Sequence, residues 1–115
     1  MIGLQSASAG QVGSVQIWLA TAPVDMRKGF DGLAEVVRTF LGHDPLSGHL
    51  FVFRNKRGER LKILWWDQRG LTVYYRRLHR GTFRFPAGEE SSLAVDSDQL
   101  LQLLDGLEVV ARKAG

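Results

Sequence analysis

The chain has 115 residues, which is enough for one domain with a buried core, and its 44% apolar and 23% charged residues are typical of a globular protein. It contains no cysteine, which excludes disulfides, thiol catalysis and thiolate metal sites. Its net charge is +3, and it shows neither an apolar run of about 18 residues nor a basic segment followed by an apolar stretch, so we expect a cytoplasmic protein without a membrane-spanning helix or signal peptide.

The first predicted element is a strand over residues 14–20, which follows a small, polar and flexible segment, residues 1–13. Apolar and other residues alternate along this strand, with Val15, Ile17 and Leu19 on one face. Pro23 then prevents the strand from continuing, because proline cannot donate a hydrogen bond to a sheet.

A helix is predicted over Met26–Leu41, with Asp25 as its N-cap. Apolar residues recur at helical spacing within it, at Phe30, Leu33, Val37, Phe40 and Leu41. Gly29 and Gly32 are unfavourable there, since each costs about 1 kcal/mol against alanine in a helix interior. Two explanations are open: close packing of the helix against the sheet, which we favour, or close approach to a phosphate or a partner's backbone.

Residues 49–86 hold most of the aromatic residues and most of the positive charge. Two Gly-containing turns, residues 55–58 and 67–70, separate runs of strand length rich in β-branched and aromatic residues, namely Leu50–Arg54, Arg60–Trp66 and Leu71–Leu78. Turns this short predict an antiparallel meander.

The period of two sorts the middle strand of this meander into two faces. One face carries Leu61, Ile63 and Trp65, and the other carries Lys62, Leu64 and Trp66. Neither face is polar near the two tryptophans, so either the chain's own helices cover both faces or one of them is a contact surface. We favour the first explanation.

The C-terminal part is predicted to be a polar connection over Pro86–Leu93 and a short helix over residues 97–105. Asp96 and Gln99 have the spacing of a capping box, and Gly106 can end the helix. The predicted fold is thus α+β: a small, mainly antiparallel sheet of four or five strands in a meander, with one longer helix on one face and a short C-terminal helix nearby. It forms a single domain over residues 14–107, followed by a flexible tail, residues 108–115.

Metal binding and catalysis find little support in the residues. The three histidines, His43, His49 and His79, match no zinc-ligand spacing, and turns or strand edges explain them better. Asp25, Asp31 and Asp67 are the carboxylates near distinctive sequence, and capping, helix and turn roles account for all three. We therefore predict no enzyme activity, no catalytic or metal-ligating residues, no cofactor and no small-molecule substrate.

Nucleic-acid binding is better supported. Residues 54–84 hold ten Lys and Arg against Glu59 and Asp67, a net charge of +8, whereas residues 85–115 carry −4. Basic residues interleaved with aromatics suit contacts with phosphates and stacking on bases, although most of the aromatics are expected in the core. The predicted DNA-binding residues are Arg27, Lys28, Arg54, Lys56, Arg57, Arg60, Lys62, Arg76, Arg77 and Arg80. A predicted partner interface comprises Trp65, Trp66 and Tyr74.

Four strings of the sequence, DMRKGFDGL (25–33), SGHLFVFRN (47–55), LKILWWD (61–67) and LLQLLDGL (100–107), carry a resemblance to a known family. The chain resembles the small accessory protein of insertion-sequence-sixty-six-type transposable elements, encoded by their second open reading frame and called TnpB there. The match covers roughly residues 15–107. It departs from the family pattern at Gln68-Arg69, in a turn that is often small and acidic, and at the end of the last helix, which lacks the usual aromatic residue.

The resemblance implies a bacterial protein that assists transposition beside a separate transposase, and it carries over no catalytic residue. Two functions follow as alternatives. The first is an accessory protein that binds the DNA of the element ends through the basic meander. The second is an interaction module that contacts the transposase without binding DNA directly.

Overall fold

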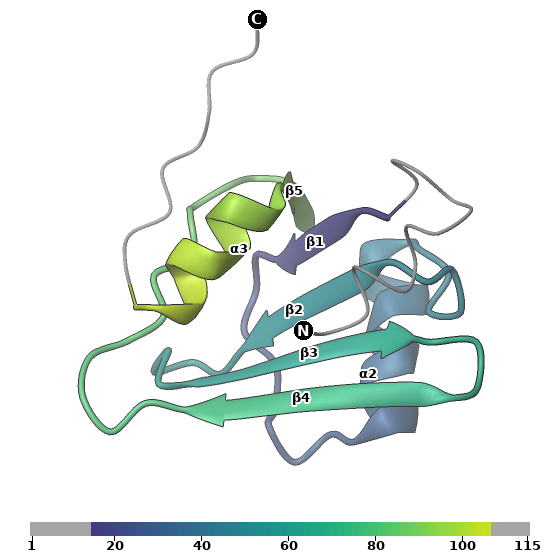
Figure 1. The fold of residues 1–115 in the computed structure, drawn as a ribbon, viewed down its shortest axis with the longest axis horizontal. Coiled ribbons are helices and arrows are strands. Elements are labelled where there is room, and N and C mark those ends of the chain that lie inside the picture. Colours follow the sequence, from purple (N-terminus) through teal and green to yellow (C-terminus); the bar gives the residue numbers. More distant parts are fainter. Residues whose placement is uncertain (1–14, 107–115) are drawn as a thin grey trace, which may run out of the picture.

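The computed structural model describes residues 15–106, in which a five-stranded sheet lies between two helical layers (Figure 1). The strands lie in the spatial order β4-β3-β2-β1-β5, and their bounds are β1 (Ile17–Ala20), β2 (Leu50–Arg54), β3 (Arg60–Trp66), β4 (Leu71–Arg77) and β5 (Ser92–Val95). β1 runs parallel to β2, and every other neighbouring pair is antiparallel. The fold is therefore α+β with a mainly antiparallel sheet, which confirms the predicted fold class.

Each face of the sheet is covered by one helical element. Helix α2 (Phe30–Val36) continues into a π-helical turn, η1 (Val37–Leu41), and both pack on the face that carries Phe51, Phe53 and Leu64. Helix α3 (Ser97–Leu104) packs on the opposite face through Leu100 and Leu103. The short helix lies across the sheet from the longer one (Figure 1), and two separate apolar cores result.

The predicted meander is confirmed in β2, β3 and β4, whose register pairs Phe53 with Lys62 and Lys62 with Tyr75. The predicted alternation also holds: Leu61, Ile63 and Trp65 belong to the core beneath α3, while Leu64 belongs to the core beneath α2. Both faces are apolar because each is covered by one of the chain's own helices.

The prediction that a helix begins at Met26 with Asp25 as its N-cap is wrong. Helix α2 begins at Phe30, and its N-cap residue, Gly29, has no side chain that could make a capping hydrogen bond. The Asp25 carboxylate instead accepts a hydrogen bond from the backbone N–H of Arg27 at 2.9 Å, and the Lys28 N–H donates to the Asp25 carbonyl at 3.1 Å. These local bonds close a turn before the helix, because aspartate competes well for nearby backbone donors.

A side chain distant in sequence holds this turn out of the helix. The Lys62 Nζ donates to the carbonyl oxygens of Met26 and Lys28, at 2.8 Å and 2.9 Å. In a helix those carbonyls would accept from N–H groups four residues further on, so the lysine takes their place. The segment 25–28 therefore lies over the α2 face of the sheet as a loop.

The structure tests one of the two explanations considered for the glycines, close packing of the helix against the sheet, whereas close approach to a phosphate or a partner's backbone stays a prediction. An added Cβ at Gly29 would meet no atom within 4 Å, and one at Gly32 would meet the Lys28 side chain at 3.0 Å. Neither glycine packs against the sheet, so the favoured explanation is wrong. Gly32 leaves room for the Lys28 side chain of the preceding turn.

The C-terminal part contains a strand where the sequence predicts only a polar connection, Pro86–Leu93. Strand β5 pairs antiparallel with β1, with Trp18 opposite Ala94 and Leu19 opposite Leu93. Its four residues are too few to show a clear alternation, and its partner lies more than 70 residues earlier in the chain. Helix α3 follows as predicted: Asp96 and Gln99 form both bonds of the capping box.

The predicted flexible segments, residues 1–13 and 108–115, lie outside the described residues. Within residues 15–106, no helix is long and apolar enough to cross a membrane.

Candidate nucleic-acid interface

The antiparallel meander gathers basic residues at one end of the sheet. β2 ends at Arg54, β3 begins at Arg60 and β4 ends at Arg77, and the register places Arg60 opposite Arg77. The turns and loops that leave these strands add further basic residues. We call this group the basic end, and it consists of Arg54, Lys56, Arg57, Arg60, Arg76, Arg77, Arg80 and Arg84.

The turn between β2 and β3 is fixed by Asn55. Its Oδ1 accepts hydrogen bonds from the backbone N–H groups of Gly58 and Arg60, both at 3.0 Å, and its Nδ2 donates to Glu59. Gly58 adopts φ +80°, a left-handed conformation that glycine takes without steric cost. The turn therefore holds Lys56 and Arg57 at a defined tip, where both are exposed.

The segment after β4 folds back beside this turn. Leu78 N–H donates to the Glu59 carbonyl at 2.8 Å, and Phe83 N–H donates to the Gly58 carbonyl at 2.7 Å. Phe83 is buried in the core beneath α3, which anchors the segment. The loop that carries Arg80 is consequently held next to the tip that carries Lys56 and Arg57.

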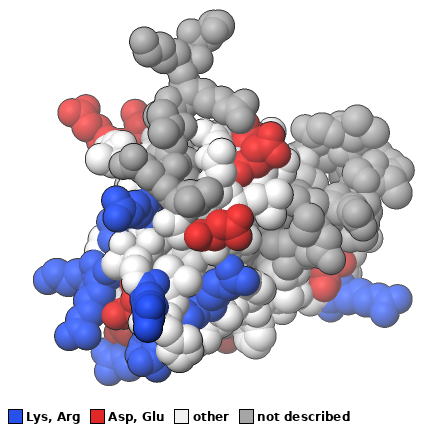
Figure 2. Space-filling view, turned by 60° about the vertical axis from the view of Figure 1, so that its left-hand side comes forward, with Lys and Arg blue, Asp and Glu red and all other residues white. Residues whose placement is uncertain are grey.

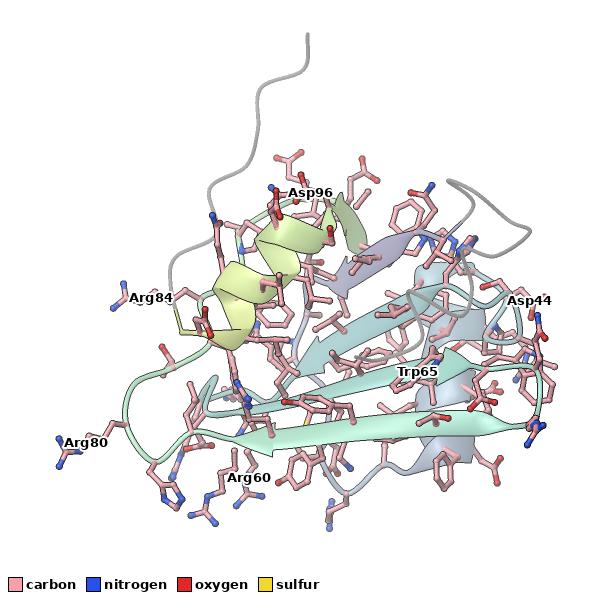
Figure 3. All side chains as sticks on the ribbon, viewed as in Figure 1. Asp44, Arg60, Trp65, Arg80, Arg84 and Asp96 are labelled. Carbon is pink, nitrogen blue, oxygen red and sulfur yellow. The ribbon has the colours of Figure 1, made fainter. Side chains whose placement is uncertain are left out.

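The result is a surface dominated by one sign of charge. Figure 2 shows Lys and Arg side chains gathered on one side of the molecule, and Figure 3 shows Arg60, Arg80 and Arg84 at the same end of the sheet. Of the acidic residues in the segment 54–84, Glu59 lies in the β2–β3 turn at this end, whereas Asp67 begins the β3–β4 turn at the other end. Such a surface attracts polyanions.

Two arginines of the basic end, Arg54 and Arg76, form hydrogen bonds within the protein, and a third, Arg60, is half-buried. Arg54 donates to the Thr21 carbonyl at 3.0 Å and lies over the Phe85 ring, and Arg76 donates to the Leu104 carbonyl at the end of α3 at 2.7 Å. The Arg60 Nε is buried and has no hydrogen-bond partner in the part of the chain that is described. Arg54 and Arg76 therefore help to fix the scaffold of the surface.

The remaining members are available to a ligand. Among residues 15–106, ion pairs form only between Arg27 and Asp25 and between Arg38 and Glu35, so Glu59, the carboxylate of the turn at this end, forms no ion pair with the basic end and accepts a hydrogen bond from Asn55 instead. Its exposed members are Lys56, Arg57, Arg77, Arg80 and Arg84. Arg84 was not among the residues predicted from sequence. Its position between Phe83 and Phe85 could have indicated it, because the side chain between two inward-facing aromatics is expected to face outward.

Three residues predicted to bind DNA lie outside the basic end. Lys62 points to the α2 face, where its Nζ bridges two loop carbonyls and lies 5.1 Å from the centre of the Tyr75 ring. Arg27 and Lys28 lie in the loop before α2, and Arg27 forms a 2.7 Å ion pair with Asp25. Hydrogen bonds from the Arg27 side chain lower the pKa of Asp25 to about 2. Arg27 is therefore partly neutralised.

The three aromatic residues of the predicted partner interface are divided between the two faces of the sheet. Trp65 is only 8% exposed and packs in the core beneath α3, with the half-buried Tyr74 against the same core. Trp66 points to the opposite face and is half-buried. The Trp65 Nε1 is also buried without a hydrogen-bond partner among the described residues. Trp65 and Tyr74 thus pack in the core beneath α3, and a partner interface at the three residues stays a prediction.

The histidines and carboxylates considered from sequence have structural surroundings. His43 stacks on Trp18 with ring centres 4.3 Å apart, and His49 Nδ1 accepts a hydrogen bond from the Gln16 N–H at 3.0 Å. Burial lowers the pKa of His49. Asp67 accepts hydrogen bonds from two backbone N–H groups of its turn and from Thr72. Within residues 15–106, no three His, Asp or Glu side chains form a group that could hold a metal ion.

Comparison with known proteins assigns the family. The model of the family described as "IS66 Orf2 like protein" matches residues 15–114. The chain belongs to the IS66 Orf2-like family. This is a family of accessory proteins of transposable elements and not a known class of enzyme, which confirms the resemblance seen in the sequence.

Two relatives come from Sinorhizobium fredii. "Uncharacterized protein y4hO" is 42% identical over 95 residues, covering 83% of both chains. "Uncharacterized protein y4jC" is 37% identical over 94 residues, covering 82% of this chain and 80% of its own. No solved structure matches the chain.

Proposed function

We propose that this IS66 Orf2-like protein assists transposition by binding duplex DNA at the element ends through the basic end of its sheet, as a non-catalytic partner of the transposase in the bacterial cytoplasm. The observation that carries the proposal is the set of five exposed Lys and Arg side chains without a carboxylate partner. Neutralising phosphates releases the counterions condensed on DNA, and this release supplies most of the affinity of such surfaces.

The surroundings of these cations favour backbone contacts over base stacking. Three of the aromatic residues interleaved with them in sequence turn inward, since Phe53 and Phe83 are buried and Phe85 is half-buried beside Arg54, whereas Tyr75 is 50% exposed. Binding of single strands depends largely on exposed aromatic rings, which stack on bases. The basic end therefore suits the phosphates of a duplex, with a modest preference for sequence.

A salt series tests this proposal. Fluorescence anisotropy would be recorded with a labelled duplex of the element end and with a scrambled duplex of the same length. Contact between five cations and five phosphates gives a slope of log affinity against log salt of about −4.5. A steep slope with both duplexes supports phosphate binding, and tighter binding of the element end adds end recognition. No affinity for either duplex at low salt would rule the proposal out.

A second candidate function, docking to the transposase, has a separate observation behind it. Phe40 is 75% exposed and borders an apolar cavity of about 250 Å³ between α2, η1 and the loop after β1, lined also by Pro23, Val24 and Val36. Exposed aromatics beside apolar hollows are common anchors of interfaces. This surface lies apart from the residues that the sequence suggested for partner contact.

Co-purification with the element-encoded transposase tests the docking function. Phe40→Ala would abolish retention of the transposase if the cavity binds it. Phe30→Ala is the matched control, because Phe30 is also exposed, at 51%, and does not line the cavity. Equal retention by both variants and the wild type would remove the cavity as the docking site.

A further inference from the structure

The two edges of the sheet differ in how they are protected. β5, at one edge, has four residues and is preceded by Glu89 and Glu90. β4, at the other edge, has seven residues, and its register with β3 runs from Arg60–Arg77 to Trp66–Leu71 without a bulge. Short length, charges and bulges normally keep edge strands from pairing with other chains. β4 has none of these over most of its length.

The hydrogen-bond pattern shows which backbone groups of β4 point outward. Leu78 N–H donates to Glu59, and Asp67 N–H donates to Gly70, at the two ends of the β3–β4 hairpin. Because hydrogen-bonded pairs alternate along an antiparallel ladder, the even-numbered residues of β4 bond to β3. The N–H and C=O groups of Leu71, Val73, Tyr75 and Arg77 therefore face away from the sheet. No backbone hydrogen bond joins them to the loops of the described chain.

The side chains of β4 have an asymmetric pattern of charge. Residues 71–75, LTVYY, carry no charge and no proline, and Tyr75 is 50% exposed. Arg76 and Arg77 follow at one end, while the turn at the other end holds the exposed Arg69 and Asp67, whose carboxylate accepts a hydrogen bond from Thr72. A second copy that paired parallel would place like charges side by side. An antiparallel copy would separate these arginine pairs and place each beside the β3–β4 turn of the other chain, where the charges of Asp67 and Arg69 balance.

We propose that β4 is the interface of a homodimer, in which two copies pair antiparallel about a two-fold axis at Tyr74. This register uses the whole strand: Val73 pairs with Tyr75 of the second copy, and Leu71 pairs with its Arg77. All four of these residues have outward-facing backbone groups, so each pair is hydrogen-bonded. The two sheets join into one, and self-complementary pairing of this kind closes at two copies.

The dimer separates the two basic ends. Each β4 strand ends in its own basic end, and antiparallel pairing directs these to opposite ends of the joined strands. With a rise of about 3.3 Å per residue, the two Arg77 backbones lie about 20 Å apart. The pairing itself depends only on the edge strand, so it stands or fails independently of DNA binding.

The substitution Tyr75→Pro tests directly whether β4 pairs with a second copy through its outer edge. Tyr75 N–H points outward, so Tyr75→Pro removes a hydrogen bond of the dimer and none of the β3–β4 ladder. Tyr75→Thr is the matched control, because it removes the same ring and keeps the N–H. Sedimentation of the full chain should give the mass of two copies for the wild type and Tyr75→Thr, and of one copy for Tyr75→Pro. A wild-type monomer at tens of micromolar, or a folded Tyr75→Pro variant that remains dimeric, would overturn the proposal.

Cross-linking gives a second test that does not depend on how well the proline variant folds. The natural chain has no cysteine, so a single introduced thiol reports only on its own position. Tyr74→Cys places two thiols across a close, non-hydrogen-bonded pair at the proposed axis, within the reach of a disulfide. Thr72→Cys faces Arg76 of the second copy and serves as the control. Mild oxidation should link Tyr74→Cys at least about tenfold faster, and equal rates would overturn the register.

Discussion

The two ends of the β3–β4 hairpin differ in how the rest of the chain packs against them. At one end, Arg60 and Arg77 are joined by two neighbouring loops to form the basic end, which stays largely exposed. At the other end, Trp65 lies beneath the α3 face and Trp66 faces the layer of α2. Figure 1 shows α2 behind this second end. The same hairpin thus supplies a charged surface and an apolar core, and helix coverage decides which is which.

This comparison shows why aromatic residues alone are a weak indicator of an interface. Here Trp65 is buried beneath α3, and Trp66 is half-buried on the other face. Charged side chains at strand ends are a better indicator, because burying an unpaired charge is far more costly than exposing it. Substitutions at the two ends should therefore affect stability and DNA affinity separately.

The largest effect on stability is expected at the end of the β3–β4 hairpin that carries Trp65 and Trp66. Trp65→Ala should lower the free energy of unfolding by about 3–5 kcal/mol, because it empties a site in the core beneath α3. Urea unfolding measures this loss, and Trp66→Ala, at a half-buried position, should cost less. DNA affinity of the folded fraction should not change. A stable Trp65→Ala protein would show that this end of the hairpin is not part of the core.

Lys62 is a basic residue of the meander that we expect to contribute to stability and not to DNA binding. Lys62→Met removes two charge-assisted hydrogen bonds to the carbonyls of Met26 and Lys28, and should cost about 2–3 kcal/mol of stability. Its slope of log DNA affinity against log salt should match that of the wild type. Lys56→Met is the control, and should leave stability unchanged while reducing the slope by about 0.9. The reverse outcome would place Lys62 in the DNA-binding surface.

Arg76 and Arg77 sharpen the comparison within the basic end itself. Arg76→Ala loses the hydrogen bond to the Leu104 carbonyl and should cost about 1–2 kcal/mol. Arg77→Ala should change stability by less than about 0.5 kcal/mol, as is usual for an exposed residue. Thermal unfolding measures both. Equal losses from the two substitutions would contradict the division into scaffold and ligand-binding arginines.

The smallest effect concerns pH, and it arises at the start of β2, outside the basic end. Burial lowers the pKa of His49, and its Nδ1 accepts a hydrogen bond from Gln16, so folding favours the neutral ring. The stabilisation is present above the ordinary histidine pKa and is lost as the pH falls below it towards the lower folded value. His49→Gln should flatten the dependence of stability on pH between about 7 and 5. An unchanged pH profile would contradict this assignment.

Elements with local determinants could be predicted from the sequence. The turn at Asn55 and the capping box of Asp96 and Gln99 depend on side chains that bond within five residues, and both are found as expected. The basic end followed from the meander, because short hairpins fix which strand ends meet. Its eight members nevertheless required the fold-back at Phe83, which sequence spacing does not reveal.

Elements with distant determinants could not be predicted. Helix α2 begins four residues later than expected because Lys62, more than 30 residues away, takes the loop carbonyls. Strand β5 exists because β1 offers it an edge, although its own four residues carry little signal. Propensity and periodicity act over a few residues, and such tertiary contacts override them.

The central claim of the proposed function is that DNA binding depends on the location of positive charge and not on its amount. Two triple variants test it, because both remove three positive charges. Lys56→Ala/Arg57→Ala/Arg80→Ala changes the basic end, whereas Arg27→Ala/Arg38→Ala/Arg69→Ala changes residues elsewhere. The salt slope for an element-end duplex should fall from about −4.5 to about −1.8 in the first variant and stay near −4.5 in the second. Equal losses of slope and affinity in both variants would contradict the claim.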